Sequence, residues 1–390
     1  MTDGHVQRIA LEDLGALRVT GADAVRFLQG QLSNDLGRAS AERSVLAGLH
    51  NPQGRTIALL RIVQLAPGDL LALLPRELAA SVASRLARYV LRAKVKVTDE
   101  SQRWSITGLV ATAVCAPLAA YPILAGEQRR LGNAWVVCVG EHPARWLLIA
   151  PAPEAQASDS AAAARAEEPL RSVPARREVW RQLDIIAGMP QVYGATSEEF
   201  VAQMLNLDVL GAIAFDKGCY TGQEVIARAH YRGRVKRRLQ RFRSRHPLDL
   251  KPGDSGELAD GRAFTVVEAV CLEDGRCEFL AVAPLPDIEP QLSAAMPPDA
   301  LLERVSAPLP GASPPDTAAL TRANVGAPAT GAALHAAVAS ELATTGAVWA
   351  PFATSPAGAP RAGGPVPPGS LTDALPHDLE RLELPYALPE

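Results

Sequence analysis

The sequence lacks the features that direct a chain into a membrane or out of the cell. No stretch reaches the roughly 20 apolar residues that a membrane-spanning helix needs, and apolar runs such as WLLIAPAP and LLALLP have the length of core strands. The first residues, MTDGHVQRIALEDLGAL, contain no basic region followed by the apolar core of a secretory signal. We therefore expect a cytoplasmic protein without a membrane partner.

The sequence also lacks an excess of charge of either sign. Its 390 residues include 39 Lys and Arg against 42 Asp and Glu, a formal net charge of -3, and 48% of them are hydrophobic. This composition is typical of a globular protein and gives no general attraction to nucleic acid. The length exceeds what one hydrophobic core usually serves, so it predicts more than one domain.

Cysteine is scarce and follows no metal-binding spacing. The five cysteines are Cys115, Cys138, Cys219, Cys271 and Cys277. They form no CxxC pair, which predicts free thiols in a reducing compartment and no metal site.

Cys271 and Cys277 flank a hairpin signal, Asp274-Gly275. If Glu273 lies opposite Arg276, then Leu272 pairs with Cys277. The two thiols are then offset, and we expect packing residues rather than a disulfide.

Apolar periodicity predicts a mixture of strands and helices. A strand at 16–21 precedes an amphipathic helix at 21–36, and two strands within 44–65 meet at a turn from Asn51 to Gly54. The next segment, 75–97, reads as a helix and a short strand. Further strands are expected at 104–112, 134–140, 145–150, 238–246 and 264–283.

Residues 291–370 differ in kind from the rest. They contain 13 prolines but only three basic and four acidic residues. Such a segment buries too little side-chain surface to offset the entropy cost of ordering, so we predict a largely disordered insert. The segment after it, 378–390, recovers alternation and is expected to return as a final strand of the β-element.

The stretch KGCYTGQEVIARAHY surrounds Cys219 with residues that favour reactivity. Gly218 and Gly222 allow a tight backbone path, and Lys217 and Arg228 bring positive charge that favours the thiolate. The cysteine is expected where a loop feeds a helix, whose dipole favours an anion. An ordinary buried thiol in a glycine-shaped turn explains the same residue types about equally well. No catalytic base follows from spacing, and His230 is read as a surface or packing residue.

This stretch resembles the K-G-C-Y-x-G-Q-E segment of the YgfZ family, folate-binding proteins related to the glycine cleavage T-protein, an aminomethyltransferase. TGADAVRFLQGQLSND, LHNPQGR, WRQLDIIAGMPQV and the terminal LELPYAL match in the same order. The resemblance covers about residues 10–290 and 375–390. It implies an α+β fold, with an aminomethyltransferase-like folate-binding region of two intertwined subdomains (1–238), a small C-terminal β-barrel (239–290 and 371–390) and the insert between the barrel segments.

The resemblance also implies a function. It points to a tetrahydrofolate derivative in a central cavity and to a monomer that helps assemble or repair iron–sulfur client enzymes, one of which methylthiolates tRNA. Cys219, with Lys217, takes the reactive position. The implied folate contacts are Trp180, Tyr220, Gln223, Glu224 and Arg228. Whether the chain turns over a folate-dependent reaction, which folate it takes and which clients it serves stay open.

Two residues depart from the family pattern. Leu14 replaces an aromatic residue near the N-terminus, and Ile186 replaces the glutamate that binds the pterin's amino-pyrimidine edge in aminomethyltransferases. The second change argues against full aminomethyltransferase chemistry. If LDIIAG is a strand, Asp184 shares a face with Ile186 and can substitute.

Nine Lys and Arg residues lie in the run bounded by Arg228 and Arg245. They could contact tRNA phosphates or the anionic tail of a polyglutamyl folate. A solvated face leading into a strand explains them more simply, because no RNA-binding motif accompanies them. An aminomethyltransferase-like enzyme and a tRNA-binding module therefore remain the alternatives to the iron–sulfur accessory protein.

Overall fold

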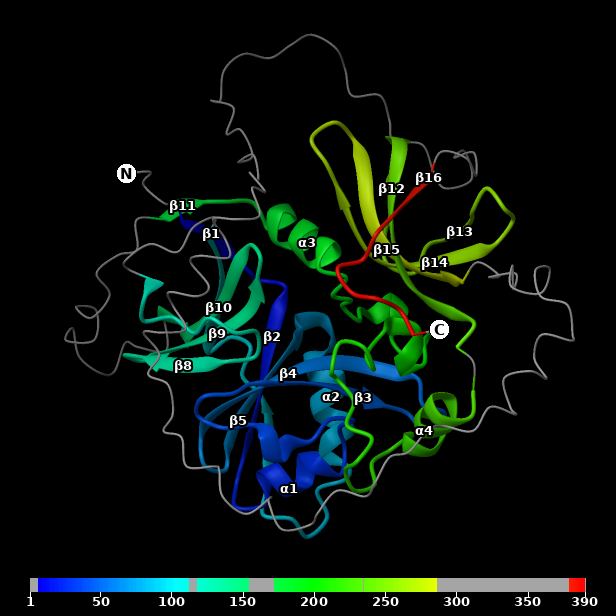
Figure 1. Cartoon of the computed structure of the whole chain (residues 1–390). Coiled ribbons are helices and arrows are strands. Elements are labelled where there is room, and N and C mark those ends of the chain that lie inside the picture. Colours follow the sequence, from blue (N-terminus) through cyan, green and yellow to red (C-terminus); the bar gives the residue numbers. More distant parts are fainter. Residues whose placement is uncertain (1–5, 112–117, 154–171, 234, 286–378, 390) are drawn as a thin grey trace, which may run out of the picture. The chain divides into compact units, whose positions relative to one another are not determined.

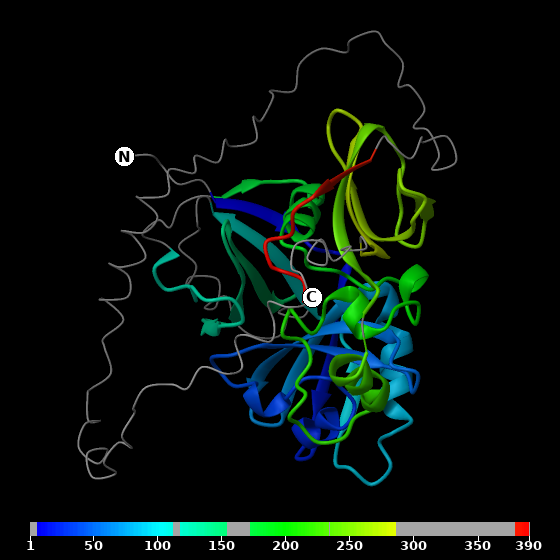
Figure 2. The same ribbon diagram turned by 45° about the vertical axis from the view of Figure 1, so that its right-hand side comes forward.

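The computed structural model describes residues 6–111, 118–153, 172–233, 235–285 and 379–389, which form three β-sheets and four α-helices (Figure 1 and Figure 2). The predicted insert at 291–370 lies outside the described residues. None of the described helices is long and apolar enough to span a bilayer.

The first sheet has the strand order β3-β4-β5-β2-β6 and is antiparallel throughout. Its strands are β2 (Leu14–Thr20), β3 (Val45–His50), β4 (Thr56–Ala66), β5 (Asp69–Pro75) and β6 (Lys96–Asp99). Helix α1 (Ala24–Gln29) follows β2, and α2 (Arg76–Ala87) follows β5 and contacts β2 and β6. The predicted turn between β3 and β4 is confirmed, with Gly54 at a φ of 73°. The first helix is shorter than the predicted 21–36, because it ends at Gly30.

The second sheet has the order β11-β1-β7-β10-β9-β8. Its strands are β1 (Val6–Ala10), β7 (Trp104–Ala111), β8 (Gln128–Leu131), β9 (Ala134–Glu141), β10 (Ala144–Pro151) and β11 (Ser172–Pro174). One apolar core, which includes Val63, Val137 and Trp180, joins this sheet to the first sheet and to α3 (Arg177–Ile186).

The third sheet is five-stranded and antiparallel, in the order β13-β14-β15-β12-β16. Its strands are β12 (Arg237–Pro247), β13 (Ser255–Glu257), β14 (Ala263–Cys271), β15 (Arg276–Pro284) and β16 (Leu379–Leu382). Successive side chains of β15 point to opposite faces of this sheet. Phe279 packs in a core made by the third sheet and its loops, whereas Leu280 packs in the large core shared with the first sheet. The predicted return of the chain end as a strand is confirmed, because β16 pairs with β12.

The hairpin register predicted for the two C-terminal cysteines is wrong. Cys271 pairs directly with Cys277, and Leu272 donates its backbone N–H to Arg276 O over 2.7 Å. The turn is therefore one residue longer on the β14 side than the prediction assumed, and the thiols face each other instead of being offset.

Candidate functional site

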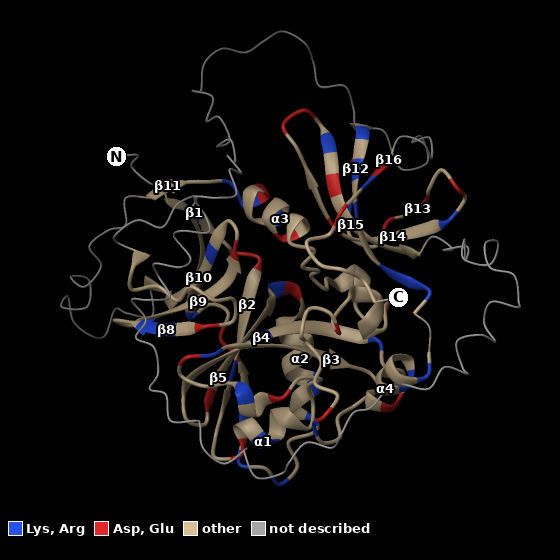
Figure 3. Cartoon of the chain, in the orientation of Figure 1, with Lys and Arg blue, Asp and Glu red and all other residues tan. Residues whose placement is uncertain are grey.

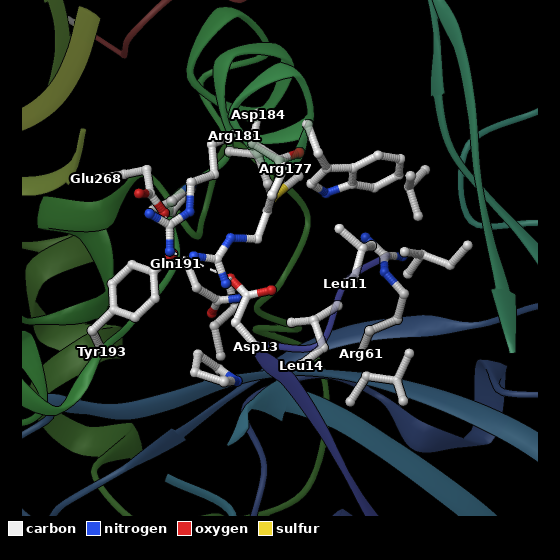
Figure 4. Close-up of a pocket in the computed structure, with 18 of the residues that line it drawn as sticks. Leu11, Asp13, Leu14, Arg61, Arg177, Arg181, Asp184, Gln191, Tyr193 and Glu268 are labelled. Carbon is white, nitrogen blue, oxygen red and sulfur yellow. Dashed lines mark hydrogen bonds and ion pairs between the residues drawn. The ribbon is translucent and has the colours of Figure 1, made fainter. Parts of the chain in front are cut away.

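A pocket of about 100 Å³ lies at α3, and we call it the Trp180 pocket. Its walls come from the first and second sheets, from α3 and the segment after it, and from β14 of the third sheet. The residues that line it are Leu11, Asp13, Leu14, Leu46, Leu59, Arg61, Leu73, Pro75, Val139, Leu147, Arg177, Trp180, Arg181, Asp184, Met189, Pro190, Gln191, Tyr193 and Glu268. Figure 4 shows Tyr193, Glu268 and Arg181 on one side of the pocket, with Arg61, Leu11 and Leu14 on the other.

Trp180 presents an aromatic surface to this pocket. Its ring lies against Gly108 of β7, where the indole occupies the space that a Cβ would need, and its side chain is largely buried. The guanidinium of Arg145 lies 5.3 Å from the ring centroid and helps to fix the orientation of the indole. Trp180 is among the residues that line this pocket, and its predicted contact with a folate stays a prediction.

Buried charges gather beside the indole. Asp184 on α3 accepts a 2.7 Å hydrogen bond from the buried Arg145. Burial nevertheless raises the pKa of Asp184, and burial lowers the pKa of nearby Arg61 to about 10. The pocket therefore offers both a carboxylate and a cation within an otherwise apolar wall.

Glu268 brings a second carboxylate from a distant part of the chain. It lies on β14, it is 3% exposed, and the Tyr193 hydroxyl donates a short hydrogen bond to its carboxylate. Burial raises the pKa of Glu268 to about 7. Near neutral pH the group can therefore act either as hydrogen-bond donor or as acceptor toward a ligand.

A third acid, Asp13, is shared by two arginines of α3. Arg181 reaches it at 3.3 Å and Arg177 at 3.6 Å. The Nε of Arg181 is buried and has no hydrogen-bond partner among the described residues. A polar ligand can satisfy this donor at little cost, because its desolvation has already occurred.

Within the segment LDIIAG, residues 183–186 are the end of α3 and not a strand, so the condition under which Asp184 and Ile186 would share a face is not met. Residues two apart on a helix point about 200° apart. Asp184 accordingly lines the Trp180 pocket, whereas Ile186 packs against the core of the first two sheets. The apolar residue at 186 therefore leaves the pocket's carboxylates in place.

Cys219 lies in an exposed loop, residues 216–222, which we call the Cys219 loop. The predicted path of the loop into a helix is confirmed, because α4 (Gln223–Tyr231) begins directly after Gly222. Gly222 has a φ of 82°, and a Cβ there would come within 2.5 Å of the backbone oxygen of Asn51. Gly222 thus lets the Cys219 loop lie close to the β3–β4 turn of the same chain. Cys219 does not line the Trp180 pocket, and its contact with a ligand stays a prediction.

Lys217 anchors this loop to the end of α1. Its ammonium donates to the backbone oxygens of Gln29, Leu32 and Asn34 at 2.6, 2.6 and 2.9 Å. Burial lowers the pKa of Lys217 to about 8. Lys217 thus uses its donors to hold the backbone that carries Cys219.

Tyr220, next to Cys219, points into the protein. Its ring is 6.4 Å from the ring of His50 and 5.1 Å from the Lys217 ammonium. Both ring nitrogens of His50 are buried without a hydrogen-bond partner among the described residues, and burial lowers its pKa to about 3. Tyr220 therefore supports the loop from beneath and does not line the Trp180 pocket.

The other predicted contacts, Gln223, Glu224 and Arg228, lie on α4, away from the lining of the Trp180 pocket. Glu224 and Arg228 pair with each other at 2.8 Å with exposed side chains. Such an exposed pair contributes little to stability. The structure thus places the predicted site residues in two places, with Trp180 in one and the remaining six near the Cys219 loop.

The basic run is partly used for internal ion pairs. Arg238 is buried and pairs with Asp208 at 2.9 Å. Arg241 and Arg243 of β12 both pair with Glu278 of the neighbouring strand β15. Figure 3 shows basic and acidic residues interspersed on the strands of the third sheet. Arg241 and Arg243 thus join β12 to β15, whereas Arg238 joins β12 to the segment that carries Asp208. All three guanidinium groups are paired with carboxylates of the same chain.

A second hollow of about 370 Å³ is more open and contains no predicted site residue. Two of its charged side chains, Arg18 and Asp69, pair with each other at 2.8 Å. No group of three or more His, Cys, Asp and Glu side chains in the described part of the chain could hold a metal ion.

Sequence reasoning missed most of the polar residues of the Trp180 pocket, namely Asp13, Arg61, Arg177, Arg181, Gln191, Tyr193 and Glu268. A usable signal existed for two of them. Arg61 interrupts the apolar run LLRIVQL and Glu268 interrupts FTVVEAVC. A charged residue within a core strand is rarely buried without a partner or a function.

Curated relatives that match this chain share one name, and a solved structure of another protein shares its fold. The tRNA-modifying protein YgfZ of Escherichia fergusonii is 32% identical over 281 residues, which cover 69% of this chain and 82% of that protein. Its namesake in Escherichia coli (strain UTI89) is 33% identical over 279 residues, with the same shares. The solved structure of glycine cleavage system aminomethyltransferase T from Bartonella henselae has a TM-score of 0.57 at 15% identity, over 73% of this chain and 79% of that one. No family model matches the chain.

Proposed function

The chain belongs to the family of tRNA-modifying protein YgfZ, and from this premise we propose that it is a cytoplasmic, folate-binding accessory protein. In this proposal it helps to assemble or repair iron–sulfur enzymes and so supports tRNA methylthiolation indirectly, with Cys219 as its reactive group. Residues 1–238 form the folate-binding region of two intertwined subdomains. Residues 239–290 and 371–390 form a small C-terminal β-barrel, and 291–370 are the insert.

The composition of the Trp180 pocket carries the proposal. A pterin ring presents a flat aromatic face and an edge of N–H donors and a carbonyl acceptor. The indole of Trp180 suits the face, and the carboxylates of Asp184 and Glu268 suit the donors. The buried, unpartnered Nε of Arg181 suits the carbonyl oxygen. The residues present therefore fit a pterin.

The size of the pocket limits what it can enclose. Its volume of about 100 Å³ is below the roughly 300–1,000 Å³ of typical ligand pockets. We therefore expect the pterin ring to enter while the benzoyl-glutamate part stays outside, with the long arginine side chains at the entrance moving to admit it. Arg177 is well suited to this movement because its side chain is 42% exposed.

The exposure of Cys219 supports its role as the reactive group. A thiol must be accessible to react, and the Cys219 loop presents it on a backbone held by Lys217. Cys219→Ala should abolish the activity in a complementation test while the fold is retained. Full complementation by Cys219→Ala would remove the cysteine from the proposal.

Calorimetric titration tests the folate site directly. Tetrahydrofolate, 5-formyl-tetrahydrofolate and folic acid should each be titrated into the full chain and into Trp180→Ala. We expect binding of at least one folate by the full chain and a loss of about tenfold or more in affinity in the variant, because the stacking face is removed. Trp104→Ala, at an indole outside the pocket, is the matched control and should leave the affinity unchanged. Absence of binding by all three folates would overturn the proposal.

An aminomethyltransferase-like one-carbon enzyme is the second candidate, because the fold resembles that of aminomethyltransferase T. It requires release of a one-carbon unit to tetrahydrofolate from an aminomethylated carrier protein. Formation of methylene-tetrahydrofolate and ammonia in that assay would favour this enzyme over the accessory protein.

A tRNA-binding module that uses the run from Arg228 to Arg245 is the third candidate. The internal pairing of Arg238, Arg241 and Arg243 weakens it. A test must therefore neutralise basic residues outside these ion pairs, such as Lys236 and Arg245. Tight tRNA binding that falls steeply with salt and is lost in Lys236→Gln/Arg245→Gln would favour this module.

A further inference from the structure

Cys271 and Cys277 form a pair of thiols that the proposed function does not use. They end β14 and begin β15, and their Sγ atoms lie 3.0 Å apart. Both sulfur atoms are also within hydrogen-bonding range of the backbone oxygen of Leu248, at 2.8 Å from Cys277 and 3.5 Å from Cys271. The two thiols therefore point to the same side of the hairpin.

The backbone at this pair suits a covalent bond between the sulfur atoms. Leu272 and Arg276 share a hydrogen bond, and the N–H of Cys277 donates to Ser244 Oγ at 2.7 Å and not to Cys271. The cysteines thus occupy a non-hydrogen-bonded pair, in which Cα atoms lie about 4.5 Å apart. Disulfides span Cα distances of about 4.4–6.8 Å and have S–S bonds of about 2.05 Å. A shift of about 1 Å between the sulfur atoms completes the bond.

The two thiols differ in access. Cys271 is exposed, whereas Cys277 is fully buried. A small molecule can reach the first sulfur atom but not the second. Burial also raises the pKa of Cys277 to about 12, which keeps this thiol protonated at neutral pH. These differences give the two residues separate roles in any exchange reaction.

We propose that Cys271 and Cys277 are a thiol–disulfide exchange site for low-molecular-weight disulfides, in which Cys271 reacts first and Cys277 resolves. The Cys271 thiolate attacks one sulfur of the small disulfide, whose S–S bond breaks and releases one thiolate. Cys277 then gives its proton to water, attacks Cys271 Sγ and displaces the second thiolate. The protein dithiol loses two electrons and two protons, and the small disulfide takes them up as two thiols. This site is independent of the folate proposal.

Oxidised glutathione tests the site in the full-length chain. Cys219→Ser is the parent, so that the exposed Cys219 does not contribute, and peptide mass mapping locates each product. The parent should lose two hydrogen atoms across Cys271 and Cys277, and dithiothreitol should restore them. Adding Cys277→Ser should instead leave one glutathione attached to Cys271, because no resolving thiol remains. Adding Cys271→Ser should leave Cys277 unmodified, because it is buried.

The wild-type chain supplies the internal standard, since its exposed Cys219 should take up glutathione under the same conditions. The proposal would be overturned if Cys271 and Cys277 both stayed free thiols in the parent while Cys219 of the wild type was modified under the same conditions. A stable glutathione adduct on Cys271 in the parent would overturn the resolving role of Cys277. Unfolding by urea, compared between oxidised and reduced parent, should show a higher midpoint for the oxidised chain, and equal midpoints would contradict a bond formed within the native hairpin.

Discussion

The Tyr193 hydroxyl donates a hydrogen bond to the Glu268 carboxylate inside the Trp180 pocket. The two residues are 75 positions apart, one in the segment after α3 and the other on β14. The third sheet therefore contributes an acid to a pocket whose other residues all precede it in the chain. A ligand in this pocket would contact both the segment that carries Trp180 and the C-terminal sheet.

Glu268→Gln should change how stability depends on pH. Burial raises the pKa of Glu268 from 4.5 to about 7, so the folded chain keeps a proton that the unfolded chain loses. This stabilisation is complete below pH 4.5 and is lost as pH rises to about 7, by up to about 1.4 kcal/mol per pH unit. Urea unfolding between pH 4.5 and 7 should show a shallower decline in Glu268→Gln, which keeps a partner for Tyr193. Exposed Glu224→Gln is the control, and equal slopes in wild type and Glu268→Gln would contradict the prediction.

His50→Leu should make the protein more resistant to acid. Burial lowers the pKa of His50 to about 3, so the unfolded chain binds a proton below about pH 6.5 that the folded chain excludes. Stability is therefore unaffected above pH 6.5 and falls toward pH 3, by up to about 1.4 kcal/mol per pH unit. Leucine removes the titrating group and breaks no hydrogen bond of the described residues. Circular dichroism during acid titration should show a lower unfolding pH for His50→Leu, and an unchanged pH would count against the prediction.

The two glycines that flank Cys219 should respond differently to alanine. Gly222→Ala places a side chain on a residue with a φ of 82° and against the Asn51 backbone oxygen. It should therefore lower the free energy of unfolding by about 1–3 kcal/mol. Gly218→Ala is the matched control, because nothing lies within 4 Å of the added Cβ. Denaturant midpoints measure both. Equal midpoints for the two variants would show that the Cys219 loop does not depend on its contact with the β3–β4 turn.

Lys217→Met should loosen the Cys219 loop. The variant removes three charge-assisted hydrogen bonds to backbone oxygens at the end of α1, which should cost about 2 kcal/mol. Hydrogen exchange of the loop amides, such as that of Cys219, should become faster. Arg228→Met removes only an exposed ion pair and should leave these amides unchanged. Unaltered exchange in Lys217→Met would assign Lys217 a role other than anchoring.

Local patterns in the sequence were enough to predict much of the secondary structure, whereas the placement of Trp180 at a ligand site was expected only from the family resemblance. The Asn51–Gly54 turn, the helix after the Cys219 loop and the final strand were predicted correctly, because turn chemistry and apolar period act over a few residues. Whether LDIIAG is a strand or a helix stayed open, since a short apolar run does not distinguish the period of a strand from that of a helix. The cysteine register was misplaced by one residue, because a turn's length is fixed by its backbone hydrogen bonds and not by the charges that flank it.

By itself, the sequence determined the family resemblance, through several motifs in the same order, and the entry of the Cys219 loop into a helix, because each of these signals lies in neighbouring residues. It left open whether Cys219 is exposed, which the structure decided. Only the tertiary structure decided that Lys217 holds the backbone at α1, that Cys271 faces Cys277 and that Glu268 reaches the Trp180 pocket. Those contacts join positions far apart in the chain or depend on the register of paired strands. Burial then sets the charge states of these groups, and no local pattern specifies burial.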